Sequence, residues 1–126
     1  MSDYNFKGEF KQKHNFQKRL AEAQRVLDNY PNRIPIIVEN DKYSKLPMMT
    51  KRKYLVPDDM TVGQFMYVVR KRMKLKSETA IYMFFDQTLA PTSKKISEVY
   101  KIYKDQDNFL YITVGAERTF GMSIKE

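Results

Sequence analysis

The sequence predicts an α+β domain in which helices pack on one sheet. Apolar segments of strand length alternate with stretches of helical periodicity, in the order α-α-β-β-α-β-α-β. The chain has 126 residues, the length of one ordinary domain with one core. Its 42% apolar fraction is too high for a disordered protein. The helical stretch 61–72 separates two strand-like segments, so these two segments cannot pair as a local hairpin. A crossover connection is therefore expected.

Two amphipathic helices are expected at the N-terminus. Phe6 and Phe10 stand four residues apart in the first. Asn15 is the expected N-cap of the second helix, which ends before Pro31 because proline disfavours helical geometry in its predecessor. Spacings of four, three and four residues place the apolar side chains of this helix on one face, namely Phe16, Leu20, Ala23 and Leu27.

Four strands are expected after these helices. The first is apolar at successive positions, which is typical of a strand covered on both faces, although Pro35 removes one ladder donor from it. The second has a basic start and a proline at its end. The last two are apolar runs far shorter than the roughly 20 residues of a membrane-spanning helix. The four segments are 33–39, 51–57, 80–85 and 109–114.

Two more helices connect these strands. Thr61 and Gln64 form a capping box for the helix at 61–72, and the cations at its end suit a helix C-terminus. Asp86-Gln87-Thr88 is expected to form a turn. The last helix is expected to be capped near Thr92 or Ser93 and is marked by Ile96, Val99, Tyr100 and Tyr103.

The composition favours a binding module over an enzyme. Without cysteine the chain can form no disulfide, zinc–thiolate site or thiol nucleophile. Its one histidine, His14, lies among lysines without a serine-elbow motif elsewhere, and is interpreted as a surface helix residue. The four glycines form no phosphate-binding loop. We therefore expect no catalytic residue, cofactor or metal.

The basic charge of the chain is concentrated in its first half. Residues 1–57 hold 12 Lys and Arg against 6 Asp and Glu, whereas residues 58–126 hold 11 against 9, which together give +8. Nucleic acid, an anionic membrane or an acidic peptide could each meet such a surface, and it could also serve solubility alone. The polar N-terminus has no signal-peptide core, so a cytosolic chain is expected.

The strand at 51–57 carries the one local feature with functional content. Side chains alternate along a strand, so Lys53 and Leu55 point to one face while Tyr54 and Val56 point to the other. At a sheet edge, both faces could border grooves and the edge could accept an added peptide strand. The alternative is that both faces are filled core, the commoner role of apolar strand residues.

Several segments together resemble the lipidated ubiquitin-like modifiers of autophagy, of the GABA-receptor-associated-protein and light-chain type. The similarity runs from about Lys11 to Gly121, and two helices precede the ubiquitin-like part. The segments that carry it are Phe16-Gln17-Lys18-Arg19, Tyr30-Pro31-Asn32-Arg33-Ile34-Pro35, Lys51-Arg52-Lys53-Tyr54-Leu55-Val56-Pro57, Met60-Thr61-Val62-Gly63-Gln64-Phe65, Val69-Arg70-Lys71-Arg72, Pro91-Thr92, Phe109-Leu110-Tyr111 and Thr119-Phe120-Gly121.

This resemblance implies a ubiquitin-like β-grasp fold with a four-stranded mixed sheet, two packed helices and two additional N-terminal helices. It divides the chain into an N-terminal helical subdomain at 1–30, a core at 31–116 and a flexible tail at 117–126. A cysteine protease would trim the tail after Gly121, with Phe120 as its apolar anchor. Activating and conjugating enzymes would then attach Gly121 to phosphatidylethanolamine.

The resemblance also implies that the protein recruits cargo receptors and autophagy proteins through short aromatic-x-x-aliphatic motifs. The aromatic pocket would use Glu22, Val26, Pro35, Ile37, Lys53, Leu55 and Phe109. The aliphatic pocket would use Tyr54, Val56, Pro57, Met60, Phe65 and Val68. Acidic residues of the motif would contact Arg33, Lys51 and Lys53. A second surface, for helical ubiquitin-interacting motifs, would use Ile81, Tyr82, Met83 and Phe84.

Such a protein would be cytoplasmic when soluble and would lie on autophagosome and related vesicle membranes when lipidated, with microtubules as a further partner. A basic RNA-binding module is one alternative, suggested by the cations at 51–53 and 70–76, but no RNA-binding sequence motif accompanies them and no nucleic acid is expected. An unconjugated cytoskeletal or trafficking adaptor is the other.

Overall fold

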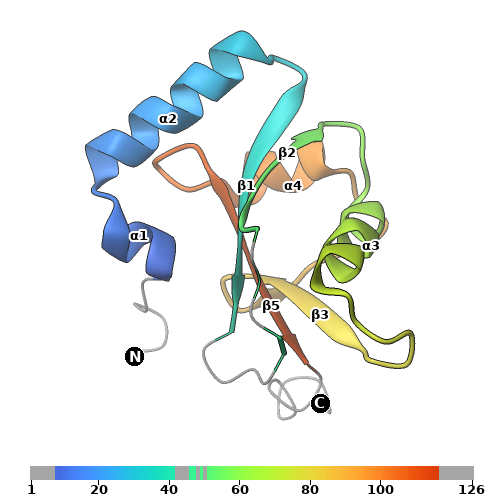
Figure 1. Ribbon diagram of the computed structural model, residues 1–126. Helices are drawn as coiled ribbons and strands as arrows, with labels where there is room; N and C mark the ends of the chain where they lie inside the picture. Colours follow the sequence, from blue (N-terminus) through green and yellow to red (C-terminus); the bar gives the residue numbers. More distant parts are fainter. Residues whose placement is uncertain (1–7, 42–45, 48, 50, 117–126) are drawn as a thin grey trace.

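A five-stranded mixed sheet separates two pairs of helices in the computed structural model, which describes residues 8–41, 46, 47, 49 and 51–116 (Figure 1). One face of the sheet carries α1 and α2, and the other carries α3 and α4. The elements are α1 (Glu9–Lys13), α2 (Phe16–Asn29), β1 (Arg33–Asn40), β2 (Lys53–Pro57), α3 (Val62–Met73), β3 (Ile81–Phe85), β4 (Thr88–Leu89), α4 (Ile96–Tyr103) and β5 (Leu110–Ala116).

The strand order in the sheet is β2-β1-β5-β3-β4. The central strands β1 and β5 are parallel, and every other neighbouring pair is antiparallel. Pairing of β1 with β5 begins at Ile36 opposite Leu110, so Pro35 lies ahead of that ladder and its missing N–H does not interrupt it. The α+β prediction is confirmed.

The larger core lies between the sheet and the helices α3 and α4. Phe65, Val69, Ile96 and Val99 project from the helices onto side chains of β1, β2, β3 and β5. The capping box predicted for α3 is present in both directions: the Thr61 side chain accepts from the Gln64 N–H, and the Gln64 side chain accepts from the Thr61 N–H. This fixes the start of the helix that borders β2.

A smaller core lies on the opposite face, beneath the N-terminal helices. Phe10 of α1 and Ala23 of α2 pack with Ile37 and Phe109, and the half-buried Tyr111 joins them. The rings of Phe10 and Phe109 meet edge to face, with centroids 5.3 Å apart. Asn15 caps α2 as predicted, because its side chain accepts from the Lys18 N–H at 2.9 Å.

Three predicted details differ from the structure. The sheet has a fifth strand, β4, because Asp86 adopts a left-handed conformation (φ 55°) that turns the chain back against β3, whereas a turn alone was expected there. The first helix begins at Glu9, and Phe6 lies outside the described residues. The N-cap of α4 is Lys95, since the carbonyl of Thr92 accepts from Gly63 and Lys95 bridges to Thr61.

Candidate functional site

The strand β2 forms one edge of the sheet. Its only neighbour among the described strands is β1, which pairs with it from Arg33 opposite Pro57 to Ile37 opposite Lys53. The outer N–H and C=O groups of β2 therefore face away from the sheet. A peptide in extended conformation could pair with such an edge.

The two faces of β2 are buried to different degrees, in the alternation predicted from sequence. Tyr54 and Val56 belong to the core beneath α3 and are only 6% and 5% exposed. On the opposite face Leu55 is half-buried and Lys53 is exposed. The α3 face of β2 is thus mostly filled core, whereas the α2 face keeps apolar surface open to a ligand.

The residues predicted for the aromatic pocket lie together on the α2 side of β2. Ile37 of β1 and Phe109, the residue just before β5, are buried, and Leu55 stands opposite Pro35 on the neighbouring strand. From α2, the half-buried Glu22 and Val26 complete the arrangement, and Glu22 accepts from Lys53 at 2.8 Å. We call this set of seven residues, Glu22, Val26, Pro35, Ile37, Lys53, Leu55 and Phe109, the aromatic groove.

The ion pair between Lys53 and Glu22 spans the groove from β2 to α2. The Lys53 ammonium also lies 5.5 Å from the ring centroid of Phe10, so it covers the end of the groove next to α1. The Lys53 side chain is 54% exposed and that of Glu22 30% exposed. An ion pair so open to solvent contributes about 0–1 kcal/mol, so an entering side chain could displace it at small cost.

The residues predicted for the aliphatic pocket lie on the α3 side of β2. Tyr54, Val56 and Phe65 are buried, and the rings of Tyr54 and Phe65 meet edge to face at 5.2 Å. Met60 and Val68 are half-buried against this core, and Pro57 is exposed. A ligand would therefore contact the outer three of these six residues, while the inner three form the support.

Tyr54 is the polar member of this set. Its hydroxyl is buried and has no hydrogen-bond partner within the described part of the chain. Burial raises the pKa of Tyr54, and the positive charge of Arg72 partly opposes that rise. The ammonium of Lys51 lies 4.9 Å from the Tyr54 ring centroid. Cations thus approach the α3 side of β2 as well as the α2 side.

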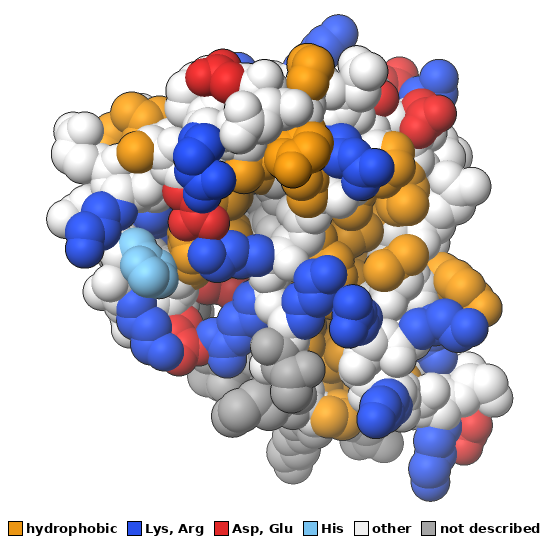
Figure 2. All heavy atoms as spheres, turned by 45° about the horizontal axis from the view of Figure 1, so that its top comes forward, with side chains coloured by type: hydrophobic (Ala, Val, Ile, Leu, Met, Phe, Trp, Pro, Cys, Tyr) orange, Lys and Arg blue, Asp and Glu red, His pale blue; other side chains and the backbone are white. Residues whose placement is uncertain are grey.

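The cations predicted to meet acidic residues are distributed around β2. Arg33 is exposed and donates to the Leu55 carbonyl at 3.4 Å, Lys53 stands beside the aromatic groove, and Lys51 lies by Tyr54. Figure 2 shows Lys and Arg side chains on either side of a central band of hydrophobic side chains between the N-terminal helices and α3. An acidic, partly apolar peptide would be complementary to this face.

Two further predicted sites are the helical-motif surface on β3 and the C-terminal conjugation site. Ile81, Met83 and Phe84 are buried in β3, and only Tyr82 of the proposed helical-motif surface is half-buried. A helical partner at this strand would therefore find little accessible surface in the described structure. Phe120 and Gly121, the predicted anchor and conjugation site, lie outside the described residues.

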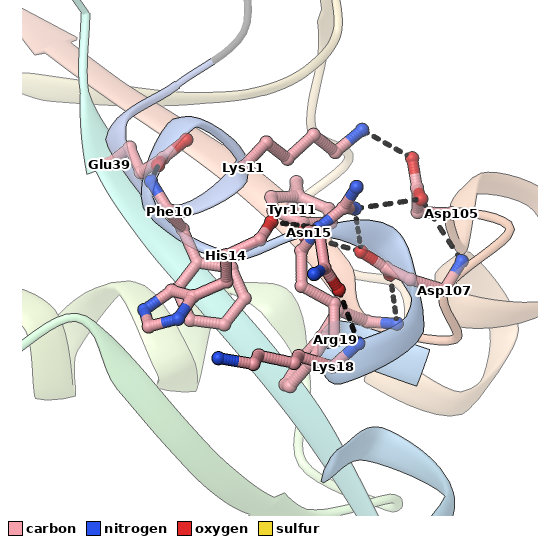
Figure 3. A network of polar contacts seen from close by, with 11 residues as sticks. Phe10, Lys11, His14, Asn15, Lys18, Arg19, Glu39, Asp105, Asp107 and Tyr111 are labelled. Atoms are coloured by element: carbon pink, nitrogen blue, oxygen red, sulfur yellow. Dashed lines mark hydrogen bonds and ion pairs between the residues drawn. The ribbon is translucent and has the colours of Figure 1, made fainter. Parts of the chain in front are cut away.

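A polar network that the sequence did not predict fastens the N-terminal helices to the sheet (Figure 3). Asp107, which is fully buried, accepts from the Arg19 guanidinium and from the Tyr111 hydroxyl, each at 2.5 Å. Asp105 accepts from the Lys11 ammonium at 2.6 Å and lies 4.0 Å from Arg19. We call these five residues, Lys11, Arg19, Asp105, Asp107 and Tyr111, the N-terminal clasp.

The clasp controls the ionisation of its members. Burial opposes ionisation of Asp105, but hydrogen bonds from Lys11 and from the Asp107 N–H, together with the charges of Lys11 and Arg19, outweigh burial and lower the pKa of Asp105. Burial and the hydrogen bond to Asp107 raise the pKa of Tyr111 above its ordinary value. Tyr111 therefore remains a neutral donor to the Asp107 carboxylate.

Helix α1 has a second attachment, to β1 and the segment before β2. The Glu39 carboxylate accepts from the Phe10 N–H at 3.0 Å, and Glu9 forms ion pairs with Lys13 and Arg52. His14, interpreted as a surface residue, is half-buried at the end of α1, with its ring 4.8 Å from that of Phe10. These contacts hold α1 across the end of the aromatic groove.

Asp105→Asn tests the clasp through its pH dependence. Because the folded pKa of Asp105 is lowered, its ionised form stabilises the fold above the unfolded pKa, about 3.9, and this contribution is lost as pH falls through the folded pKa. In urea unfolding, wild type should exceed the variant in stability at pH 7, and the gap should narrow below about pH 4. Asp59→Asn, at an exposed carboxylate, is the matched control. A gap that does not change with pH would contradict this role.

The described residues contain no group of His, Asp and Glu side chains arranged to hold a metal ion. None of their helices combines the length and apolar character that crossing a bilayer requires.

The mixed sheet with its crossover helix and the two N-terminal helices define a ubiquitin-like α+β protein, with β2 as an open edge strand. Known proteins agree with this class. The profile of the family described as "Autophagy protein Atg8 ubiquitin like" matches residues 18–121. The chain belongs to this Atg8 family of ubiquitin-like autophagy proteins.

Relatives and solved structures support the assignment over most of the chain. It is 54% identical to Autophagy-related protein 8e of Arabidopsis thaliana over 114 residues, 90% of this chain and 93% of that protein. It is 50% identical to Autophagy-related protein 8 of Phaeosphaeria nodorum, with 94% and 99% covered.

Among solved structures, Trypanosoma brucei ATG8 superposes with a TM-score of 0.85 at 38% identity, covering 89% of this chain and 97% of that one. Plasmodium falciparum Atg8, solved in complex with a Plasmodium falciparum Atg3 peptide, gives 0.80 at 31% identity, covering 86% and 96%. The predicted β-grasp fold is thereby confirmed, with one more strand than expected.

Proposed function

We propose that this Atg8-family protein is a modifier that is trimmed to Gly121, conjugated to phosphatidylethanolamine, and used to recruit cargo receptors and autophagy proteins to autophagosomal membranes. The chain itself performs no catalysis, and a cysteine protease and the activating and conjugating enzymes supply the chemistry. The tail would be 117–126, cut after Gly121, next to a core at 31–116 and a helical subdomain at 1–30. Cytoplasmic and membrane-bound pools would follow from this cycle, and microtubules would be a further partner.

The observation that carries the recruitment proposal is the open α2 face of the edge strand β2. Half-buried Leu55 stands over a buried apolar floor that contains Ile37 and Phe109, and exposed cations flank it. An aromatic side chain entering between α2 and β2 would bury apolar surface there, worth about 1.5–3 kcal/mol. Displacing the Lys53–Glu22 pair would offset at most about 1 kcal/mol of that gain.

Backbone pairing with β2 would set the spacing of the motif. Successive side chains of an added strand point to opposite faces, so an aromatic on the α2 side and an aliphatic three residues later fall on opposite faces of β2. The aliphatic side chain would then contact Pro57, Met60 and Val68, the accessible members of the second set. Acidic residues before the aromatic would meet Lys53 and Arg33.

The solved complex of Plasmodium falciparum Atg8 with an Atg3 peptide supports a peptide-binding role. By analogy, one peptide partner of this chain would be its own conjugating enzyme.

Leu55→Ala tests the aromatic groove directly. The change removes a groove wall and its apolar contacts, so affinity for an acidic peptide with an aromatic-x-x-leucine motif should fall by about 2 kcal/mol, roughly thirtyfold. Isothermal titration calorimetry measures it. Leu89→Ala is the matched control, because Leu89 is exposed on β4 at the far edge of the sheet. Unchanged affinity in a folded Leu55→Ala protein would reject the groove assignment.

A further inference from the structure

A hollow at the C-terminal end of α3 lies apart from the aromatic groove. It has a volume of about 470 Å³. Its lining joins two apolar side chains, three cations and a hydroxyl, namely Tyr67, Leu75, Arg70, Lys71, Lys74 and Ser77. We call it the α3 hollow. Tyr67, Arg70 and Lys71 belong to α3. Their spacing from Phe65 along the helix places them on the side opposite this buried ring.

Arg70 builds the wall of the α3 hollow. Its guanidinium donates to the carbonyls of Thr79 at 2.5 Å, Lys76 at 2.9 Å and Ser77 at 3.4 Å, which ties the loop after α3 to the helix. Lys74 ends the helix in a left-handed conformation (φ 56°), and its N–H donates to the carbonyls of Arg70 and Lys71. The concave shape is therefore part of the fold before any ligand arrives.

The α3 hollow presents mostly positive charge, with one carboxylate next to its lining, that of Glu78, which accepts from the Ser77 hydroxyl at 3.4 Å. Lys71 and Lys74 are exposed, and neither forms an ion pair with a carboxylate within the described ranges. Tyr67, one helical turn before Lys71, is 60% exposed, and the Lys71 ammonium lies 5.3 Å from its ring centroid. Cations at the C-terminal end of a helix also stabilise the helix dipole. An experiment must therefore distinguish ligand binding by these lysines from a purely structural role.

We propose that the α3 hollow binds an acidic peptide segment of a partner protein, with carboxylates at Lys71 and Lys74 and an apolar side chain against Tyr67 and Leu75. A hollow that places an exposed ring, Tyr67, beside the half-buried Leu75 suits an apolar side chain better than the flat surface of a bilayer. A single exposed aromatic ring in the hollow provides no row of stacking platforms for the bases of a nucleic acid. This interaction is separate from motif binding at β2.

The test is an NMR titration of the full chain with the probe peptide acetyl-EELEE-amide. Backbone amides of Tyr67, Lys71, Lys74 and Leu75 should shift saturably. The double variant Lys71→Gln/Lys74→Gln should bind about tenfold more weakly, as expected for two exposed ion pairs. The matched control is Lys101→Gln/Lys104→Gln, which removes two lysines with the same spacing at the end of α4 and should bind normally.

Additional ligands distinguish a peptide site from an anion site or a lipid site. Acetyl-EEGEE-amide should bind more weakly than the leucine peptide, and acetyl-KKLKK-amide should not bind. Equal shifts with inorganic phosphate would reduce the α3 hollow to an unspecific anion site and overturn the proposal. Peptide-induced shifts confined to β2 would also overturn the proposal, as would normal peptide binding by the α3 double variant. A double variant that no longer binds phosphatidylserine vesicles but still binds the peptide would overturn it as well. A double variant that is merely less stable, with normal peptide affinity, would assign the cations to helix stability alone.

Discussion

Asp107→Ala is expected to lower the free energy of unfolding by about 3–5 kcal/mol, the usual effect of removing one partner from a buried ion pair. The carboxylate is fully buried and accepts from Arg19, from the Tyr111 hydroxyl and from the Phe109 N–H at 2.8 Å. Without it, the largely buried Arg19 guanidinium keeps its hydrogen bond to the His14 carbonyl, at 3.0 Å, but loses its close carboxylate partner, since Asp105 lies 4.0 Å away. Urea unfolding of both proteins at pH 7 measures the difference.

A second variant separates the ion pair from simple packing. Replacing both partners with apolar residues, in Arg19→Met/Asp107→Leu, should recover much of the loss because no charge is then left buried and unpaired. Asp59→Ala, at an exposed position, should change stability by less than about 0.5 kcal/mol. A loss below about 1 kcal/mol in Asp107→Ala would show that the clasp does not hold the N-terminal helices.

The clasp connects stability to the candidate function. Arg19 lies on the same helix as Glu22 and Val26, which wall the aromatic groove, and Asp107 lies two residues before Phe109 in its floor. The Arg19–Asp107 contact therefore ties the helix that walls the groove to the segment that leads into its floor. Loosening α2 would weaken peptide binding even where no groove residue has changed.

The sequence alone was sufficient to predict the two faces of β2. Period-two alternation is a local property, so Lys53 and Leu55 could be separated from Tyr54 and Val56 without knowledge of the fold. Which face stays open could not be predicted, because that depends on how closely α3 packs on one side and α2 on the other. In the structure α3 buries Tyr54 and Val56, while α2 leaves Leu55 partly accessible.

The clasp was beyond sequence reasoning for a different reason. Arg19 and Asp107 are 88 positions apart, and no periodicity links them. The only available signal was a pair of acids, Asp105 and Asp107, just before the last strand of a chain whose first half is basic. Similarly, the strand β4 depends on a left-handed Asp86, which a turn-like sequence permits without requiring.

The structure also bears on the RNA-binding alternative. Among the described aromatic residues, only Phe16, Tyr30 and Tyr67 are exposed, and they belong to the start of α2, the end of α2 and α3. Single-stranded nucleic acid is usually held by neighbouring rings in a basic groove. Three rings on separate parts of the surface do not form such a groove, and most other aromatic side chains serve the two cores.

Lipidation is expected to require Gly121 as the last residue of the chain. A chain ending at Gly121 should be conjugated to phosphatidylethanolamine liposomes by its cognate enzymes with ATP, whereas a chain ending at Phe120 should not. The proposed reactive group is the Gly121 carboxylate, which is activated and then attacked by the lipid amine. Both residues lie outside the described structure, so the proposal rests on Thr119-Phe120-Gly121 and the family resemblance.

Glycine has a chemical reason to occupy this position. Lacking Cβ, it leaves its carbonyl unhindered during acyl transfer and allows backbone angles that are closed to other residues. A chain ending in Gly121→Ala should therefore react more slowly than the Gly121 form, and the untrimmed chain ending at Glu126 should need the protease first. Gel-shift and intact-mass measurements follow the reaction, with omission of ATP as the control. If the form ending at Phe120 is lipidated equally well, the conjugation site is wrong, while the peptide-binding proposal at β2 still stands on its own test.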